Sequence, residues 1–148
     1  MFEYILVFLG AAIPWLEIAL VIPLGIIGGL SPVWVMFLAF TGNILTVLVV
    51  IIGFEKVKKW LDSRKPRDGK EESKRTERGK RIWNKYGMPG VALFGPLLIG
   101  THIAAFIGLL FGANKTNAAI WMTISIALWT LVIGIATAMG FELFGRSF

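Results

Sequence analysis

Residues 13–32 read IPWLEIALVIPLGIIGGLSP and place one carboxylate, three prolines and a Gly-Gly pair inside a long apolar region. A charged carboxylate at the centre of a bilayer costs about 2.5–3.5 kcal/mol, so Glu17 must be paired, hydrated or protonated there. Pro14 and Pro23 each remove a backbone donor and hinder the preceding helical turn. Because broken backbone at membrane depth is tolerated only where protein or water covers it, we expect this stretch to line a cavity.

The composition of the chain is that of an integral membrane protein. Of its 148 residues, 56% are hydrophobic and 16% are charged, and the mean hydropathy is +0.75. There is no cysteine, and the single histidine is His102, so we expect no disulfide, thiol nucleophile or metal-ligand cluster. We predict no metal and no other cofactor. We also predict that the protein is not an enzyme, since no nucleophile or second buried acid accompanies Glu17.

The positive charge is concentrated in one segment. Residues 55–86 carry 13 Lys and Arg against 6 Asp and Glu, while the rest of the chain is nearly neutral. A short loop rich in Lys and Arg stays on the cytoplasmic side of a membrane. The segment has no recognisable nucleic-acid-binding motif, so we predict membrane lipids as partners and no nucleic acid. We therefore expect a multi-pass protein of the cell membrane with the basic loop 55–86 in the cytoplasm.

Four apolar stretches surround this loop. Residues 1–30 and 87–113 are broken by prolines and glycines, while residues 33–54 and 118–139 are each long enough for one helical crossing. The same order, a broken stretch followed by a long helix, occurs twice. We therefore interpret the chain as one all-α membrane domain made of two repeats.

The boundaries of this predicted domain cover the whole chain, residues 1–148. Residues 1–60 form the first repeat and residues 87–148 form the second. Between them, residues 61–86 are the basic cytoplasmic loop, for which an interfacial helix and a solvated linker are the two alternatives. Within the first repeat, Ser31 and Pro32 are typical of a helix start.

The broken stretches allow two topologies. About 27 residues of helix measure roughly 40 Å, which suits one tilted crossing, but two half-depth arms that meet near Pro14 also fit. If both stretches are re-entrant hairpins, the repeats are inverted and both termini lie outside. If both cross fully, there are four spanning helices and both termini are cytoplasmic. Our predicted fold is the inverted repeat, an arrangement common in transporters. The predicted hairpin breaks are Pro14, Pro23, Pro96 and Gly100.

Two side chains are candidates for transport and proton coupling. Glu17 and His102 each follow a predicted break, and if the repeats face each other they could form a proton relay. The alternatives are a structural acid that accepts backbone bonds freed at Pro14, and a histidine bonded to a carbonyl. Further cavity-lining candidates are Trp15, Asn43 and Thr101. For the last two, helix packing or capping is the alternative.

Several motifs resemble the small multidrug export protein family. They are EIALVIPLG at 17–25, Gly42-Asn43, and YGMPGVALFGPLLIGT at 86–101. That family in turn resembles the DedA proteins and the wider VTT group, and PWLE at 14–17 is similar to their acidic hairpin motif. The resemblance implies two re-entrant hairpins packed against tilted helices, and a role in moving or scrambling lipids, in some members with proton coupling. The arginine that DedA proteins carry after the second proline is absent near Ile99, which argues against an anionic phosphate substrate.

We therefore predict a membrane transporter or lipid scramblase. It moves a small amphiphile or a lipid headgroup through a cavity lined by the broken hairpins, with proton coupling through Glu17. One alternative is a membrane scaffold that transports nothing. Another is a four-helix proton antiporter like the small multidrug resistance proteins, although the long basic loop argues against it. Because so few crossings enclose little space, we expect a homodimer or a higher homo-oligomer.

Overall fold

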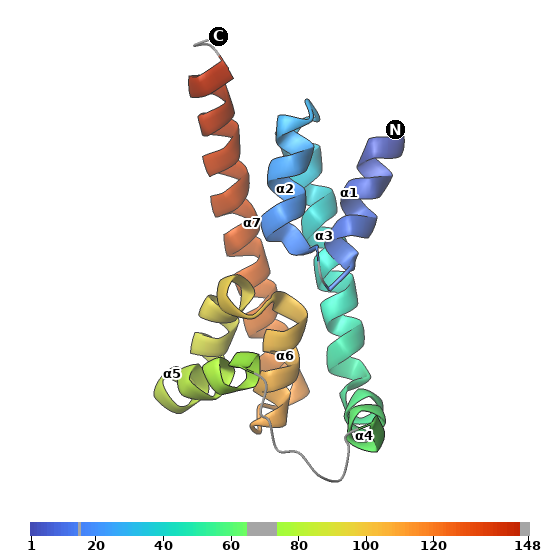
Figure 1. Ribbon diagram of the computed structural model, residues 1–148, viewed down its shortest axis with the longest axis vertical. Coiled ribbons are helices and arrows are strands. Elements are labelled where there is room, and N and C mark those ends of the chain that lie inside the picture. The colour runs from blue at the N-terminus through green and yellow to red at the C-terminus, as the bar shows by residue number, and fades with distance from the viewer. Residues whose placement is uncertain (15, 65–73, 146–148) are drawn as a thin grey trace. The chain divides into compact units, whose positions relative to one another are not determined.

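The regular structure of the chain is helical throughout the described residues, which are 1–14, 16–64 and 74–145 of a computed structural model. The all-α prediction is therefore confirmed for this part of the chain (Figure 1). The helices are α1 (Phe2–Ala12), α2 (Glu17–Ile27), α3 (Pro32–Ile52), α4 (Phe54–Arg64), α5 (Lys74–Leu98), α6 (Thr101–Leu110) and α7 (Lys115–Gly145). They form two units: Met1–Thr46 with Thr123–Phe148, and Val47–Met122.

Two helices, α3 and α7, are long and apolar enough to cross a membrane, over Pro32–Ile52 and Lys115–Gly140. Both crossings predicted from the sequence are thus present as continuous helices. Pro32 is the first residue of α3, a position where its missing N–H is not needed. At the start of α7, the Asn117 N–H donates to Asn114 Oδ1 at 2.6 Å, which caps the helix.

The first hairpin, which we define as residues 2–27, consists of α1 and α2 packed against each other (Figure 1). Each helix has 11 residues and is about 16 Å long, too short to cross a hydrocarbon core of about 30 Å by itself. The Ser31 N–H donates to Tyr4 Oη at 3.2 Å. The chain therefore leaves this hairpin beside the point where it entered.

The tip of the first hairpin lies beside the middle of α3. Asn43, the twelfth of the 21 residues of α3, donates from Nδ2 to the carbonyl oxygen of Ala11 at 3.1 Å. The neighbouring Gly42 permits this approach, because a Cβ there would collide with the carbonyl oxygen of Phe8. The hairpin thus extends along about half the length of α3.

The second hairpin, which we define as residues 88–110, consists of the last part of α5 and all of α6. Gly87, with φ +67° and ψ −154°, divides α5 into segments 74–86 and 88–98. The α5 helix packs against α6, which has only 10 residues. The rings of Trp83 and Phe111, one before and one after this hairpin, have centroids 6.0 Å apart. The second hairpin therefore also starts and ends near one place.

The turns of the two hairpins differ in part from the predicted breaks. Pro14 lies in the connection between α1 and α2, but Pro23 lies inside α2 and Pro96 lies inside α5. The turn of the second hairpin falls at Ile99 and Gly100, where Gly100 has φ +98°. Proline is restricted to φ near about −65° and cannot take that conformation, whereas glycine can. A proline removes one backbone donor, and both helices continue through that loss.

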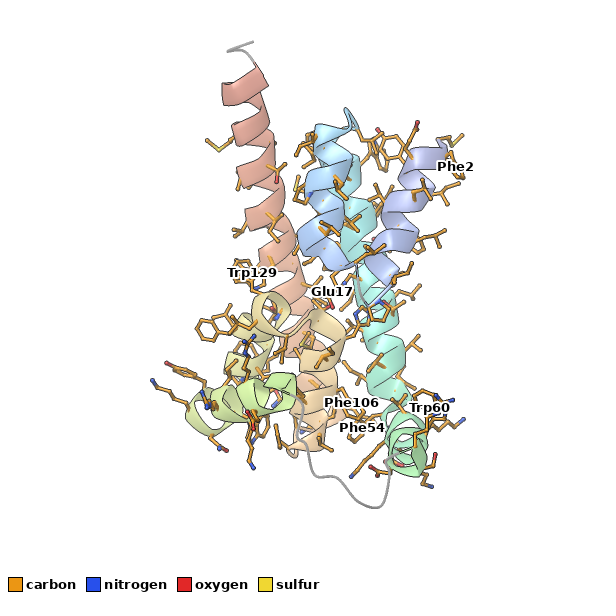
Figure 2. The ribbon with its side chains drawn as sticks, in the orientation of Figure 1. Phe2, Glu17, Phe54, Trp60, Phe106 and Trp129 are labelled. Atoms are coloured by element: carbon orange, nitrogen blue, oxygen red, sulfur yellow. The ribbon has the colours of Figure 1, made fainter. Side chains whose placement is uncertain are left out.

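The end of α3 lies beside the start of α7, and α4 follows α3 directly. Lys115 Nζ donates to the carbonyl oxygen of Ile52 at 3.3 Å, where α3 ends. The ring centroids of Phe54 in α4 and Phe106 in α6 lie 5.2 Å apart (Figure 2). Trp60 is half exposed and carries the Arg64 guanidinium 4.1 Å above its ring. This basic, aromatic segment has the character of a helix at a membrane surface.

We predict that Gly42→Ala lowers stability by about 1–3 kcal/mol, because its Cβ would force α1 and α3 apart. Gly140→Ala in α7 is the matched control, since no atom lies within 4 Å of the added Cβ. That variant should keep or raise stability, as alanine favours a helix by about 0.5–1 kcal/mol over glycine. Melting temperatures in detergent test the pair, and equal values for both variants would contradict the close approach.

Candidate functional site

Glu17 is the buried acid at the tip of the first hairpin (Figure 2). It is the first residue of α2, and only 9% of its surface is exposed. The backbone N–H groups of Leu16 and Glu17 both donate to the Ile13 carbonyl oxygen, at 3.2 and 3.3 Å, which closes the turn around Pro14. The partial positive charge of a helix N-terminus stabilises a carboxylate at this position.

The backbone of Glu17 is strained. Its φ is +45°, and within the described ranges it is the only residue other than glycine with a positive φ. The left-handed conformation costs a residue with a Cβ about 1–2 kcal/mol. Such strain persists where the surrounding structure fixes it, and it is common at functional sites. The glutamate is thus held in a conformation that a glycine would adopt without cost.

The two hairpins share a spacing of residues and of positive φ angles. The same spacing of 83 residues separates Glu17 from Gly100, Gly25 from Gly108, and Gly29 from Gly112. Glu17 and Gly100 both have positive φ at a hairpin turn, and Gly29 and Gly112 both have positive φ after the returning helix. The second hairpin therefore uses glycine where the first uses glutamate. The carboxylate is not required to form such a turn.

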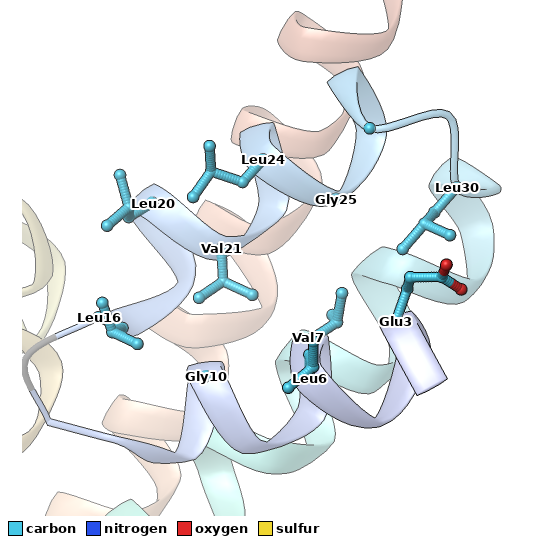
Figure 3. A pocket seen from close by; sticks show the side chains of 11 residues that line it. Glu3, Leu6, Val7, Gly10, Leu16, Leu20, Val21, Leu24, Gly25 and Leu30 are labelled. Carbon is cyan, nitrogen blue, oxygen red and sulfur yellow. The ribbon is translucent and has the colours of Figure 1, made fainter. Parts of the chain in front are cut away.

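A groove of about 310 Å³ runs along the first hairpin between α1 and α2 (Figure 3). Its apolar lining is mainly Leu6, Val7, Leu16, Leu20, Leu24 and Leu30. Glu3 lies at the base of the hairpin; its side chain is 68% exposed, and its Oε2 lies 3.5 Å from the Met1 amine. Glu17 does not line the groove. The groove and the buried acid are therefore separate features of one hairpin.

The tip of the second hairpin holds two polar side chains. Thr101 and His102 begin α6 directly after Gly100, and both are buried. Thr101 Oγ1 and His102 Nδ1 lie 3.2 Å apart, within hydrogen-bond distance. Both hairpins thus carry a buried ionisable side chain in the first turn of the returning helix.

The site residues predicted from the sequence lie in different units of the structure. Glu17 and Asn43 belong to one unit, and Thr101 and His102 belong to the other, so pairing of Glu17 with His102 stays a prediction. Trp15 lies outside the described residues. The bond from Asn43 to Ala11 agrees with the packing alternative for that amide. Among the described side chains, no group of three or more His, Cys, Asp and Glu could hold a metal ion.

Sequence reasoning missed three features of the first hairpin. These are the bond between Tyr4 and Ser31, the close contact at Gly42, and the groove that ends at Glu3. Tyr4 and Ser31 are 27 positions apart and share no motif, so only the packing of the hairpin brings them together. A small residue next to an amide in an apolar helix is a general signal of helix packing, and it could have indicated Gly42.

Comparisons with known proteins give one match. A protein-family model described as "Putative small multi-drug export protein" matches residues 17–132, from the first residue of α2 into α7. Searches of curated proteins and of solved structures return no match.

We predict that Glu17→Gly is more stable than Glu17→Ala by about 1 kcal/mol, because glycine accepts the left-handed backbone and alanine does not. Both variants lack the carboxylate, so their difference isolates the backbone strain. At exposed Ala19 in the same helix, Ala19→Gly should instead lower stability by about 1 kcal/mol. Thermal unfolding in detergent measures all three, and a less stable Glu17→Gly variant would refute the strain.

Proposed function

The chain belongs to the small multi-drug export protein family, and from this premise we propose that it is a membrane transporter or scramblase for a small amphiphile or a lipid headgroup. The substrate moves along the two hairpins, and protonation of Glu17 is coupled to its movement. The membrane location agrees with the two long apolar helices. The export activity agrees with the family description.

The observation that carries the role of Glu17 is its backbone. A buried carboxylate occupies a left-handed position that the corresponding turn of the second hairpin fills with Gly100. Structure alone would favour glycine at both turns, since glycine has no Cβ to strain. Buried acids within membranes commonly serve proton relays and substrate pathways. A chemical role for the carboxylate accounts for its presence at a strained site.

Two contacts support the re-entrant topology for the first hairpin. The Tyr4–Ser31 bond holds the two ends of the hairpin together, and the Asn43–Ala11 bond sets its tip beside the middle of α3. If α3 crosses the membrane, the hairpin enters and leaves on one side and reaches about half depth. The short arms of about 16 Å agree with this depth.

A further contact separates the two topologies predicted from the sequence. In the re-entrant scheme, the end of α3 and the start of α7 lie on the same side of the membrane. With four full crossings, they lie on opposite sides. The bond from Lys115 Nζ to the Ile52 carbonyl joins these two ends and so supports the re-entrant scheme. Lys and Arg are enriched on the cytoplasmic side, so we place this bond and the basic loop there.

The rival functions differ in what they require of the hairpins. A scaffold needs the tight packing at Gly42 but no strained acid at Glu17, so the backbone of Glu17 favours transport. A four-helix antiporter like the small multidrug resistance proteins needs four crossings, which the short arms disfavour. We propose no enzymatic activity. We also propose that membrane lipids contact the apolar surface, and that the chain works as a homodimer or higher oligomer.

We predict that Glu17→Gln lowers flux in proteoliposomes at least tenfold. An amide cannot take up and release a proton as a carboxylate can. General acid–base groups contribute about 10²–10⁴-fold to the rate of reactions that need them. Transfer of a fluorescent phospholipid and uptake of decyltrimethylammonium driven by a pH gradient are the two readouts. Glu17→Asp keeps a titratable group and should retain part of the flux.

The control for this experiment is Glu55→Gln, which removes an exposed acid from α4 and should leave flux unchanged. Size-exclusion profiles of all variants confirm that each is folded. If Glu17→Gln transports as fast as the wild type, the coupled mechanism is wrong.

We predict that both chain termini lie outside the cell. The chain has no native cysteine, so Phe2→Cys and Ser147→Cys each provide a single labelling site. An impermeant maleimide added to intact cells should modify both variants, while a cysteine in the basic loop, such as Ser63→Cys, should react only after lysis. Protection of both termini in intact cells would instead indicate four full crossings.

A further inference from the structure

The groove of the first hairpin has two chemically different ends (Figure 3). Leu16 lines one end, next to the hairpin tip, and Glu3 and Leu30 line the other end, at the base where Tyr4 meets Ser31. In the re-entrant topology the base lies at the headgroup layer and the tip lies near the midplane. The groove therefore runs in the direction of a lipid chain, with its one carboxylate at headgroup depth.

The size of the groove limits what it can hold. Its volume of about 310 Å³ is at the lower end of the range of about 300–1,000 Å³ for small-molecule sites. Gly10, Gly25 and Gly28 also line the groove. At Gly10 and Gly25, an added Cβ would lie 3.0–3.1 Å from Val21 or Val35, so these glycines also keep the helices close. The space suits one apolar chain rather than the two chains of a phospholipid.

The charge of the groove indicates which kind of ligand headgroup it can bind. Glu3 is the charged side chain of the lining, and the other lining residues are leucine, valine and glycine. The Glu3 side chain is 68% exposed, so an ammonium group can reach its carboxylate from solvent. A single exposed ion pair is weak, so the apolar chain of the ligand must supply the larger part of the binding energy.

We propose that this groove binds a single-chain amphiphile with a cationic headgroup. The ammonium lies against the Glu3 carboxylate, and the chain lies along the leucines towards Leu16. As a substrate class, this inference rests on the proposed export function, and it brings the end of the apolar chain to Leu16 near the hairpin tip. The binding itself is independent of transport and is measured without it.

The experiment measures binding of radiolabelled decyltrimethylammonium to the full chain in phosphatidylcholine nanodiscs, with empty nanodiscs subtracted. The wild type should bind it saturably. Glu3→Gln should weaken binding about three- to fivefold, the size expected for a partly screened ion pair. Glu3→Lys should abolish binding of the cation and favour decyl sulfonate instead. Equal affinity of the wild type for decyltrimethylammonium, decanol and decyl sulfonate would overturn the proposal.

A second pair of variants tests the groove without changing charge. Leu24→Trp fills the groove and should weaken binding at least tenfold, whereas Ile27→Trp on the same helix lies outside the lining and should leave binding unchanged. The two residues are similarly exposed, at 61% and 59%. If both variants bind like the wild type, the cation binds elsewhere and the proposal is wrong.

The remaining outcomes distinguish this inference from its rivals. If Leu24→Trp changes the oligomeric state by light scattering and the wild type binds no cation, a second copy of the chain occupies the groove. If a zwitterionic single-chain phosphocholine is the only compound that competes for the groove, the groove binds lipid headgroups. Either this result or the previous one overturns the proposal. Saturable cation binding without any flux supports the proposal and refutes transport. Flux of a phospholipid without cation binding supports transport and refutes the proposal.

Discussion

The bond from the Asn43 side-chain amide to the Ala11 carbonyl is the constraint on which the structure depends. In the re-entrant topology that we propose, α1 stops inside the membrane, and no water is present in hydrocarbon to bond its last carbonyl groups. α3 supplies the missing donor at its middle, and Gly42 beside it lets the backbone of α1 come close enough. In this topology the break at the tip needs a long helix to cover it, and this need links the broken stretch to the continuous helix that follows it.

The positions of both broken stretches could be predicted from the sequence, but the residues at their turns could be predicted only in part. Pro14 and Gly100 mark the turns because their restricted or unusual backbone conformations are properties of the residue type. Pro23 and Pro96 carry the same signal, yet both lie inside helices. A proline removes one hydrogen bond, and the packing around it decides whether the helix ends. Contacts such as that of Tyr4 depend on three-dimensional packing and leave no local pattern.

For the candidate site, the types of residue could be predicted from the sequence, but their backbone conformations could not. An acid in an apolar stretch identified Glu17 because the cost of a charge in hydrocarbon is large. Its left-handed backbone could not be read from the residue, since glutamate rarely adopts it. The comparison with Gly100 became possible only when both turns had known φ angles. That comparison shows that glutamate is not the residue type that suits this turn best, since the other turn has glycine at the corresponding position.

The most direct test of the account measures membrane depth along the first hairpin. Single spin labels are placed at exposed positions on both arms and at the tip, and their accessibility to oxygen and to a nickel chelate is compared in bilayers. The positions are Ile5, Leu9, Ile13, Leu16, Leu20, Leu24 and Ile27. A re-entrant hairpin predicts a depth that increases from 5 to 16 and then decreases again to 27, on one side of the membrane. A depth profile that passes through the midplane once and reaches the opposite surface at 27 would contradict it.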